Sequence, residues 1–315
     1  MDAALHRDEQ RDAFRQDVLE GLAGTQKSLP SRWLYDPRGC ELFEEITHLA
    51  EYYPTRTETA ILKAHRADLA DFCGSGAALL EYGAGSGLKT ELLLGALDRP
   101  RGYLPVDIAG DFLEATAERV RRRFNSLQVN PIVADFTAEF ALPAAAGGEG
   151  RRVVFFPGST IGNLNTRESG LLLMRMRRQA GPQGRALIGV DLKKDLAVLL
   201  PAYDDEAGVT AEFNRNILVR INRELEGQFD AAQFRHHARW NETESAVEMH
   251  LESPIDQVIG VAGRGFAFRR GESIHTESSR KYEIKAFSEL ARRHGWHTQR
   301  LWTDAQRHFA VFGLI

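Results

Sequence analysis

The stretch Leu79-Leu80-Glu81-Tyr82-Gly83-Ala84-Gly85-Ser86-Gly87 decides the fold. Its apolar first part, from Ala78 to Tyr82, predicts a short buried strand. Glycines 83, 85 and 87 then let the backbone turn tightly and let a ligand approach it closely. A nicotinamide-binding loop spaces its glycines G-x-G-x-x-G, but here the third glycine comes one residue early and position 88 is Leu. Glu81, just before the loop, is also poorly placed for a pyrophosphate.

Two further strand ends carry side chains suited to a nucleoside. Asp107 follows the strand predicted at 102–106, about 20 residues beyond the glycines, where a carboxylate can accept both ribose hydroxyls. Asp135 and Phe136 follow the strand predicted at 131–134 and suit an adenine amino group and the face of the base. The glycines alone could be a plain turn. Three such features on successive strand ends favour a ligand site, because open α/β sheets bind ligands there. The acid-x-G-x-G-x-G form resembles the first motif of Rossmann-like methyltransferases, which implies S-adenosylmethionine (SAM) as cofactor. Glu81, the acid of that motif, is acceptable near the sulfonium cation of SAM.

Helices and strands alternate through the middle of the chain. Helices are expected at 57–72, 88–97, 112–124 and 168–180, and strands at 78–82, 102–106, 131–134, 152–156 and 185–190. Short apolar strands between helices predict a parallel sheet covered on both faces. A helix at 283–294 and strands at 297–303 and 308–314 suit the antiparallel edge of a class I methyltransferase sheet.

The remaining segments break this alternation. The chain opens with a helix predicted at 7–22 and an irregular, aromatic-rich stretch at 33–56. A long helix is expected at 206–226, with antiparallel strands at 245–252, 256–261 and 265–269. We therefore predict an α/β protein with a second, smaller α+β domain. The SAM-binding domain comprises 57–191 plus 281–315, and the substrate-binding domain comprises 1–56 plus 192–280.

Composition narrows the function classes. Of the 315 residues, 43% are hydrophobic, which is enough to form a large core. The net charge is −4, so the chain lacks the basic surplus that is typical of nucleic-acid binders. Cys40 and Cys73 form neither a metal-ligand spacing nor a disulfide framework, and no metal is expected. Residues 1–20 lack the apolar core of a signal peptide, and no apolar run is long enough to span a membrane. We expect a cytoplasmic monomer without nucleic-acid or membrane partners.

Six blocks of sequence together resemble the histidine-specific Nα-methyltransferases of ergothioneine biosynthesis, over nearly the whole chain. They are Leu29–Asp36 (LPSRWLYD), Glu51–Glu58 (EYYPTRTE), Gly158–Asn163 (GSTIGN), Tyr203–Asp205 (YDD), Phe213–Asn216 (FNRN) and Thr276–Ser279 (TESS). The resemblance implies SAM-dependent trimethylation of the α-amine of free L-histidine, giving hercynine, the first step of that biosynthesis.

The resemblance also implies which residues hold each end of histidine. Asn163 and Tyr203 match the pair that binds the carboxylate, and both carry neutral donors. Glu277 and Ser279 match the pair that recognises the imidazole, with Tyr52 as a further contact. Each has a plainer alternative. Asn163 could cap a loop, Tyr203 and Tyr52 could be core rings, Glu277 could be an exposed strand-end carboxylate, and Ser279 could be the N-cap of a helix beginning near Lys281.

Around the α-amine, the matching residues are Tyr35, Phe43 and Gly158, with Tyr35 and Gly158 the expected catalytic positions. Aromatic faces suit a growing quaternary ammonium through cation–π attraction of about 0.5–2 kcal/mol. Phe43 could instead be ordinary core. Met249 matches a pocket-wall position, although it could equally be core filler. Lys89 matches the residue that faces the methionyl carboxylate of SAM, the alternative being a solvated helix charge.

Other functions stay open at this stage. The same fold could methylate another free amino acid, such as tryptophan, although both polar imidazole partners are present. A non-catalytic SAM-binding module would retain the glycine loop while losing the substrate residues, and these are present too. A nucleic-acid methyltransferase is disfavoured by the acidic charge balance, and a protein methyltransferase is a further option.

Overall fold

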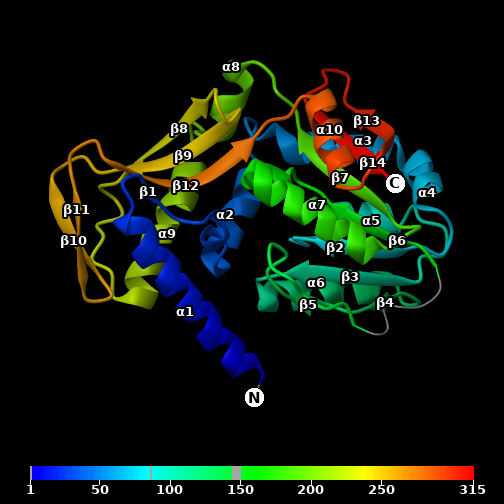
Figure 1. The fold of residues 1–315 in the computed structure, drawn as a ribbon, viewed down its shortest axis with the longest axis horizontal. Coiled ribbons are helices and arrows are strands. Elements are labelled where there is room, and N and C mark those ends of the chain that lie inside the picture. The colour runs from blue at the N-terminus through cyan, green and yellow to red at the C-terminus, as the bar shows by residue number, and fades with distance from the viewer. Residues whose placement is uncertain (1, 86, 144–149) are drawn as a thin grey trace. The chain divides into compact units, whose positions relative to one another are not determined.

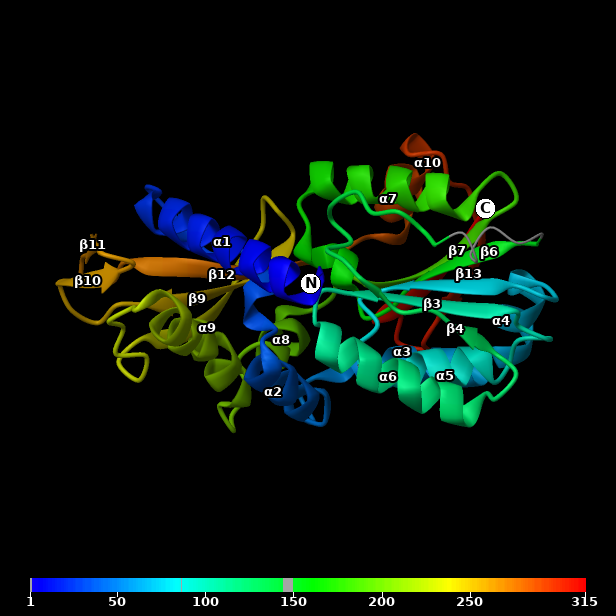
Figure 2. The ribbon, with the colours of Figure 1, turned by 90° about the horizontal axis from the view of Figure 1, so that it is seen from below.

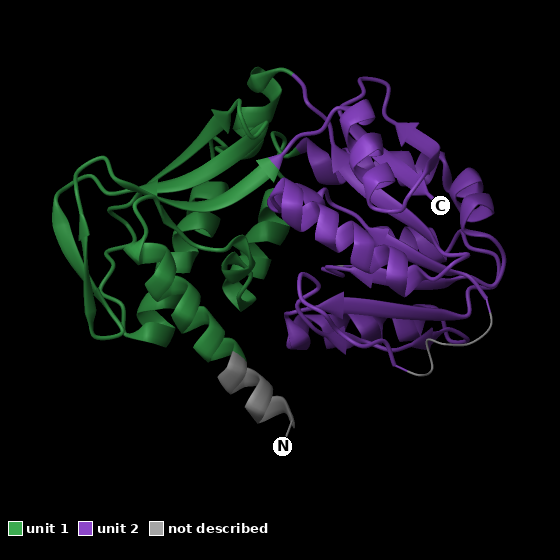
Figure 3. Cartoon of the chain, in the orientation of Figure 1, with its two compact units in different colours: residues 1–52, 195–279 green, residues 53–194, 280–315 purple. Residues whose placement is uncertain are grey.

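The computed structural model describes residues 2–85, 87–143 and 150–315 (Figure 1). The chain divides into two compact units (Figure 3). Unit 1 comprises Met1–Tyr52 and Asp195–Ser279, and unit 2 comprises Tyr53–Lys194 and Arg280–Ile315. These boundaries differ from the predicted domain boundaries by one to four residues. Among the described residues, no helix is long and apolar enough to cross a bilayer.

Unit 2 is built on one mixed sheet, which among the described residues has eight strands. Its order is β13-β14-β7-β6-β2-β3-β4, and β5 also pairs with β3. The parallel strands are β2 (Ala78–Tyr82), β3 (Gly102–Asp107), β4 (Gln128–Val129), β5 (Ile132–Val133), β6 (Arg152–Phe156) and β7 (Arg185–Asp191). The antiparallel edge is β13 (Thr298–Thr303) and β14 (Phe309–Leu314). This is the Rossmann-like sheet of class I methyltransferases, as predicted.

Helices cover both faces of this sheet (Figure 2). On one side lie α7 (Thr166–Ala180) and α10 (Ile284–Arg293). On the other lie α3 (Tyr53–Ala64), α4 (Arg66–Cys73), α5 (Leu88–Leu94) and α6 (Gly110–Arg123). Side chains of β2 alternate between two cores: Leu80 and Tyr82 pack with α7, whereas Leu79 packs with Leu93 of α5. Burial on both faces explains why these strands read as continuous apolar runs.

Unit 1 contains a four-stranded sheet of described residues, in the order β1-β12-β9-β8. The strands are β1 (Lys27–Ser28), β8 (Arg235–Asn241), β9 (Ala246–Glu252) and β12 (Ser273–Arg280), with a separate hairpin of β10 (Gln257–Val261) and β11 (Arg264–Phe268). The helices are α1 (Asp2–Ala23), η1 (Ser31–Leu34), α2 (Pro37–Thr47), α8 (Leu196–Leu199), η4 (Leu200–Ala202) and α9 (Val209–Leu225). Helix α9 packs against β8 and β9 through its apolar face.

Several local predictions need correction. The helix expected at 57–72 is two helices that meet at His65. The stretch 33–56, expected to be irregular, contains α2, which Asp36 caps by accepting from the Gly39 N–H and which Pro37 begins. Strands β8 and β12 escaped prediction because their sequences, RHHARWN and SIHTESSR, are too polar to show an apolar run.

Candidate functional site

The glycine loop of unit 2 connects β2 to α5. Gly83, Gly85 and Gly87 all have positive φ, at 67°, 46° and 67°. A Cβ at Gly87 would lie 2.8 Å from Thr116 Cγ2, so a larger residue there would force its neighbours apart. The Gly85 N–H points to Asp107 Oδ2, 3.4 Å away, and Thr116 Oγ1 donates to the Gly85 carbonyl. Positive φ favours glycine at all three positions, crowding adds to this preference at Gly87, and the turn leaves backbone groups beside the tip of β3.

Asp107 lies at that tip, as the sequence predicted for a ribose-binding carboxylate. Its Oδ1 accepts from the Ala109 N–H at 3.0 Å. Burial raises the pKa of Asp107 above its usual value, and the backbone hydrogen bonds from Ala109 and Gly85 partly offset this rise. A ligand hydroxyl that donates to this carboxylate would favour its charged form.

Glu81 is more deeply enclosed than its predicted place beside a sulfonium implies. It is 1% exposed, and its two oxygens accept from Thr90 Oγ1, at 2.5 Å, and from the Tyr103 hydroxyl. Burial raises the pKa of Glu81 to about 8, although both hydrogen bonds lower it. In this structure Glu81 joins β2, β3 and α5 beneath the loop.

Asp135 and Phe136 follow β5 after one intervening residue. Asp135 Oδ1 accepts from the Thr137 N–H at 2.8 Å, which shapes the turn. The Phe136 ring stacks on Tyr82, with centroids 6.0 Å apart and planes 15° from parallel. A Cβ at Gly83 would lie 3.6 Å from the Phe136 ring, so this ring borders the glycine loop.

Glu58 connects two of the predicted site residues within unit 2. Its Oε2 accepts from Lys89 Nζ at 2.5 Å and from the Gly158 N–H at 2.8 Å. Glu58 is fully buried, and the Lys89 side chain is only 15% exposed, so the reading of Lys89 as a solvated charge is wrong. Sequence reasoning quoted Glu58 in a motif but assigned it no role. Glu58 is a single buried acid on α3, and one such residue leaves no periodic pattern in the sequence.

Asn163 ends η3 (Thr160–Asn163), the turn that follows β6. The cap of the next helix is supplied by Asn165, which accepts from the Glu168 N–H while Glu168 reaches back to the Asn165 N–H. Asn163 is therefore not the cap of α7.

In unit 1, four predicted residues lie in a cluster of aromatic rings: Tyr35, Phe43, Tyr52 and Tyr203. Ring centroids are 5.6 Å apart for Tyr35–Phe43, 6.0 Å for Phe43–Tyr52 and 6.3 Å for Tyr52–Tyr203. Phe213 of α9 joins them, 5.4 Å from Tyr35 and 6.0 Å from Phe43. Sequence reasoning missed Phe213 as a site residue, because an apolar ring on a helix reads as core.

Polar groups border this aromatic cluster. The Tyr203 hydroxyl lies 2.8 Å from Ser279 Oγ. Glu277 is 8% exposed, so its reading as an exposed carboxylate is wrong. Burial raises the pKa of Tyr35 well above its usual value, and the nearby charge of Glu277 adds to the effect. Tyr35 therefore stays a neutral phenol at neutral pH. Met249, on β9, is buried, and its carbonyl accepts from Thr276 Oγ1 at 3.0 Å.

An irregularity in β12 sets which of its side chains face this cluster. Simple alternation would put His275, Glu277 and Ser279 on one face. Burial instead departs from this alternation at Thr276 and Glu277, which are both buried. Glu277 and Ser279 thus lie on the buried face, whereas His275 contacts Ser278 on the other. Ser279 is a strand residue, and helix α10 begins at Ile284, so the N-cap reading of Ser279 is wrong.

Asp36 fixes the backbone next to Tyr35. Its Oδ1 accepts from the Gly39 N–H and from Asn216 Nδ2, and its Oδ2 accepts from Arg223 at 2.7 Å. Burial would raise the pKa of Asp36, but these bonds, led by that from Arg223, lower it overall. Two of the quoted blocks, LPSRWLYD and FNRN, therefore meet through Asp36 and Asn216.

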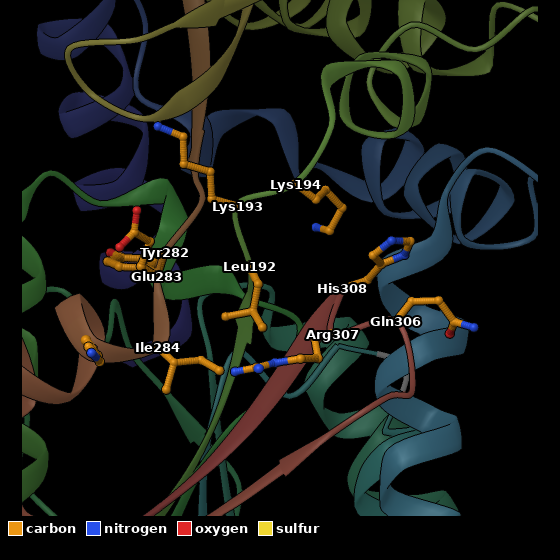
Figure 4. A pocket seen from close by; sticks show the side chains of 10 residues that line it. Leu192, Lys193, Lys194, Tyr282, Glu283, Ile284, Gln306, Arg307 and His308 are labelled. Atoms are coloured by element: carbon orange, nitrogen blue, oxygen red, sulfur yellow. The ribbon is translucent and has the colours of Figure 1, made fainter.

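Unit 2 also has a cavity of about 430 Å³ that contains no predicted site residue. Figure 4 shows Lys194 and His308 on one side of it and Tyr282 and Glu283 on the other. Lys194 Nζ donates to Asp191 at 2.6 Å and to the Tyr53 hydroxyl, and Lys281 Nζ lies 2.7 Å from Asp191. This buried ion network ties β7 to α3 and to the segment before α10.

The predicted residues thus fall into two sets. Unit 1 carries Tyr35, Phe43, Tyr52, Tyr203, Met249, Glu277 and Ser279; unit 2 carries Glu81, Gly83, Gly85, Gly87, Lys89, Asp107, Asp135, Phe136, Gly158 and Asn163. The predicted contacts of Gly158 and Asn163 with the amino acid stay predictions.

Comparison with known proteins identifies the family of this chain. The sequence profile of the family described as "Histidine-specific methyltransferase, SAM-dependent" matches residues 14–314. The histidine N-alpha-methyltransferase of Mycobacterium tuberculosis is 42% identical over 95% of this chain and 94% of its own length. The histidine N-alpha-methyltransferase of Mycolicibacterium smegmatis is 37% identical over 98% of this chain and 96% of its own length. Ergothioneine biosynthesis protein 1 of Neurospora crassa is 30% identical over 89% of this chain and 31% of its own length. The chain is a member of the SAM-dependent, histidine-specific methyltransferase family.

Proposed function

We propose that this enzyme transfers three methyl groups in succession from SAM to the α-amine of L-histidine, forming hercynine for ergothioneine biosynthesis. The observation that supports this most directly is the unit 1 cluster in which Tyr35, Phe43 and Phe213 lie near the polar pair Tyr203–Ser279 and the Glu277 carboxylate. Such a cluster offers aromatic faces for an ammonium and polar partners for an imidazole.

For the amino acid, each polar group has a defined task. Glu277 accepts a hydrogen bond from one imidazole nitrogen, and Ser279 serves the other. Tyr203, held by Ser279 at 2.8 Å, donates to the carboxylate together with Asn163. Tyr52 and Met249 line the wall beside them.

For the cofactor, the unit 2 residues fit a SAM molecule. Glycines 83, 85 and 87 keep the loop open for the methionyl part, and Lys89, anchored by Glu58, pairs with the methionyl carboxylate. Asp107 accepts the ribose hydroxyls, and Asp135 with Phe136 holds the adenine. Glu81 supports the loop from below.

The reaction is a displacement at an already activated methyl group. The protein therefore contributes mainly by aligning nucleophile and methyl, which can supply several kcal/mol. The amine must lose a proton to water before each attack, and a free amino group titrates within reach of neutral pH. Tyr35 is a neutral phenol and so acts through a hydrogen bond to the amine rather than as a phenolate base. Once the nitrogen has no N–H left, the rings of Tyr35, Phe43 and Phe213 still attract it.

We also infer that the chain acts on histidine as a cytoplasmic monomer, without a nucleic-acid or membrane partner. The acidic charge balance argues against a nucleic-acid partner.

The decisive experiment is incubation with SAM and either histidine or tryptophan, followed by mass detection of products. A product three methyl groups heavier than histidine supports the proposal. Trimethylated tryptophan, without a histidine product, would assign another substrate, and SAM binding without turnover would indicate a non-catalytic module. Glu277→Gln is the internal control, because it should weaken histidine use and leave SAM binding intact.

A further inference from the structure

Two histidines and a glutamate lie together on the four-stranded sheet of unit 1, outside the aromatic cluster. Glu248 and His250 are two residues apart on β9, so they share a sheet face, and His275 is on the neighbouring strand β12. One ligand atom from each of Glu248, His250 and His275 lies within 4.8 Å of the other two. We propose that this His–Glu cluster binds one divalent transition-metal ion, of which Zn²⁺ is the leading candidate.

The distances in the His–Glu cluster are close to those that zinc needs. Tetrahedral Zn²⁺ with bonds of about 2.0–2.1 Å holds its ligand atoms roughly 3.3–3.5 Å apart. His250 Nε2 and Glu248 Oε2 are already 3.3 Å apart. The two imidazole rings have centroids 5.1 Å apart, and His275 has to rotate away from its 3.0 Å contact with Ser278 Oγ to complete the set. Three protein ligands leave a fourth position for water.

The residue types of the cluster also suit a metal. Imidazole nitrogens and carboxylate oxygens are among the ligand atoms that Zn²⁺ takes in proteins.

Outer contacts hold these ligands in place. His250 Nδ1 lies 3.1 Å from Ser273 Oγ, and Asn241 donates to Glu248 Oε1 at 2.7 Å. These bonds leave His250 Nε2 and Glu248 Oε2 facing each other. Partners of this kind orient the first ligands of metal sites. The His250 and Glu248 side chains are only 3% and 14% exposed, which makes the pair unlike a solvated surface contact.

Arg239 would compete with a metal ion for the Glu248 carboxylate. It is the cross-strand neighbour of Glu248, and its Nε lies 3.5 Å from the same Oε2 that the metal would use. Its side chain is 55% exposed and can turn to solvent when an ion binds. Removing this positive charge should strengthen metal binding, whereas a cluster that only holds strands together has no reason to gain affinity.

The test is calorimetric titration of untagged, chelator-treated full-length protein with Zn²⁺, and separately with Co²⁺, without histidine or SAM. We expect one ion per chain with a Kd on the order of 1 μM or tighter, and a visible absorption band for Co²⁺. His250→Gln and His275→Gln should each raise the Kd about 100-fold, and Arg239→Gln should lower it. Circular dichroism of each variant checks folding.

His237→Gln is the matched control. His237 is the cross-strand neighbour of His250 on the same face, but its side chain is 49% exposed, and it faces Glu252. This variant should bind Zn²⁺ like the wild type. The proposal is overturned if the folded wild type binds neither ion at 100 μM. It is also overturned if binding survives in the folded His250 and His275 variants. Because no methylation is measured, the result is independent of the proposed function.

Discussion

The Tyr203 hydroxyl and Ser279 Oγ, 76 residues apart in sequence, lie 2.8 Å from each other in unit 1. This contact links the turn after η4 to strand β12. It brings a predicted carboxylate-binding residue next to a predicted imidazole-binding residue. The proposed histidine site depends on this pairing, since a free amino acid must be held at both ends to present its amine.

Glu277→Gln should weaken histidine binding about 10- to 100-fold. The change keeps the shape of the side chain but removes the charge that accepts the imidazole N–H, and such charged hydrogen bonds contribute about 1.5–3 kcal/mol. SAM affinity should not change, because the glycine loop belongs to unit 2. Calorimetry with each ligand checks both statements, and unchanged histidine affinity would remove Glu277 from the imidazole site.

Tyr35→Phe should slow turnover roughly tenfold without abolishing it. Burial and Glu277 hold the pKa of Tyr35 well above its usual range, so the phenol contributes one hydrogen bond rather than a basic oxygen. The ring and its contact with Phe43 remain. Single-turnover rates followed by mass spectrometry measure the effect. Complete loss of turnover with intact histidine binding would show that Tyr35 is an essential proton acceptor.

Glu58→Gln should raise the KM for SAM about tenfold and affect the KM for histidine less. The substitution removes the charge that holds Lys89 Nζ at 2.5 Å, so the ammonium is no longer fixed toward the methionyl carboxylate. Glu91→Gln is a matched control on α5, because Glu91 pairs with Arg119 and Arg123 rather than with a predicted site residue. Equal effects of both variants on the KM for SAM would argue against a specific role for Glu58.

The free energy of unfolding should fall as pH rises from about 4.5 to about 8, because of the raised pKa of Glu81. Burial raises the folded-state pKa of Glu81 to about 8, so the folded state keeps a proton that the unfolded chain releases near pH 4.5. The stabilisation is complete below that pH and is lost as pH rises through 8, at up to about 1.4 kcal/mol per pH unit. Urea unfolding of Glu81→Gln between pH 5 and 8 should lack this slope. Parallel profiles for variant and wild type would refute the assignment.

Asp191→Asn should destabilise the protein by roughly 3–5 kcal/mol, because it leaves Lys194 and Lys281 buried without their counter-charge. Urea midpoints measure the change. Glu289→Gln, an exposed acid paired with Arg292 and Arg293, is the control and should have little effect. A change within about 0.5 kcal/mol for Asp191→Asn would mean that water or other groups compensate the lysines.

Local pattern was sufficient for most strands of the unit 2 sheet, although the short strand β4 (Gln128–Val129) was not predicted. The predicted bounds of β2 and β6 match the structure, because a strand buried on both faces is mostly apolar, with Glu81 and Arg152 the exceptions here. The tight turn before α5 was also predicted from the sequence, since the positive φ at 83, 85 and 87 favours glycine. Family resemblance, rather than pattern, supplied the predicted histidine-binding residues.

Long-range packing decided the rest. The polar strand β8 forms by pairing with β9, and the polar strand β12 forms by pairing with β9 and β1. No local run of residues predicts such pairing. The departure from alternating burial at Thr276 and Glu277, which puts Glu277 on the buried face and leaves His275 on the other, is a property of the folded strand. The roles of Glu58 and Phe213 likewise arise from contacts across long sequence separations. Periodicity records which side of an element is buried, whereas only folding in three dimensions determines which groups from distant segments become neighbours.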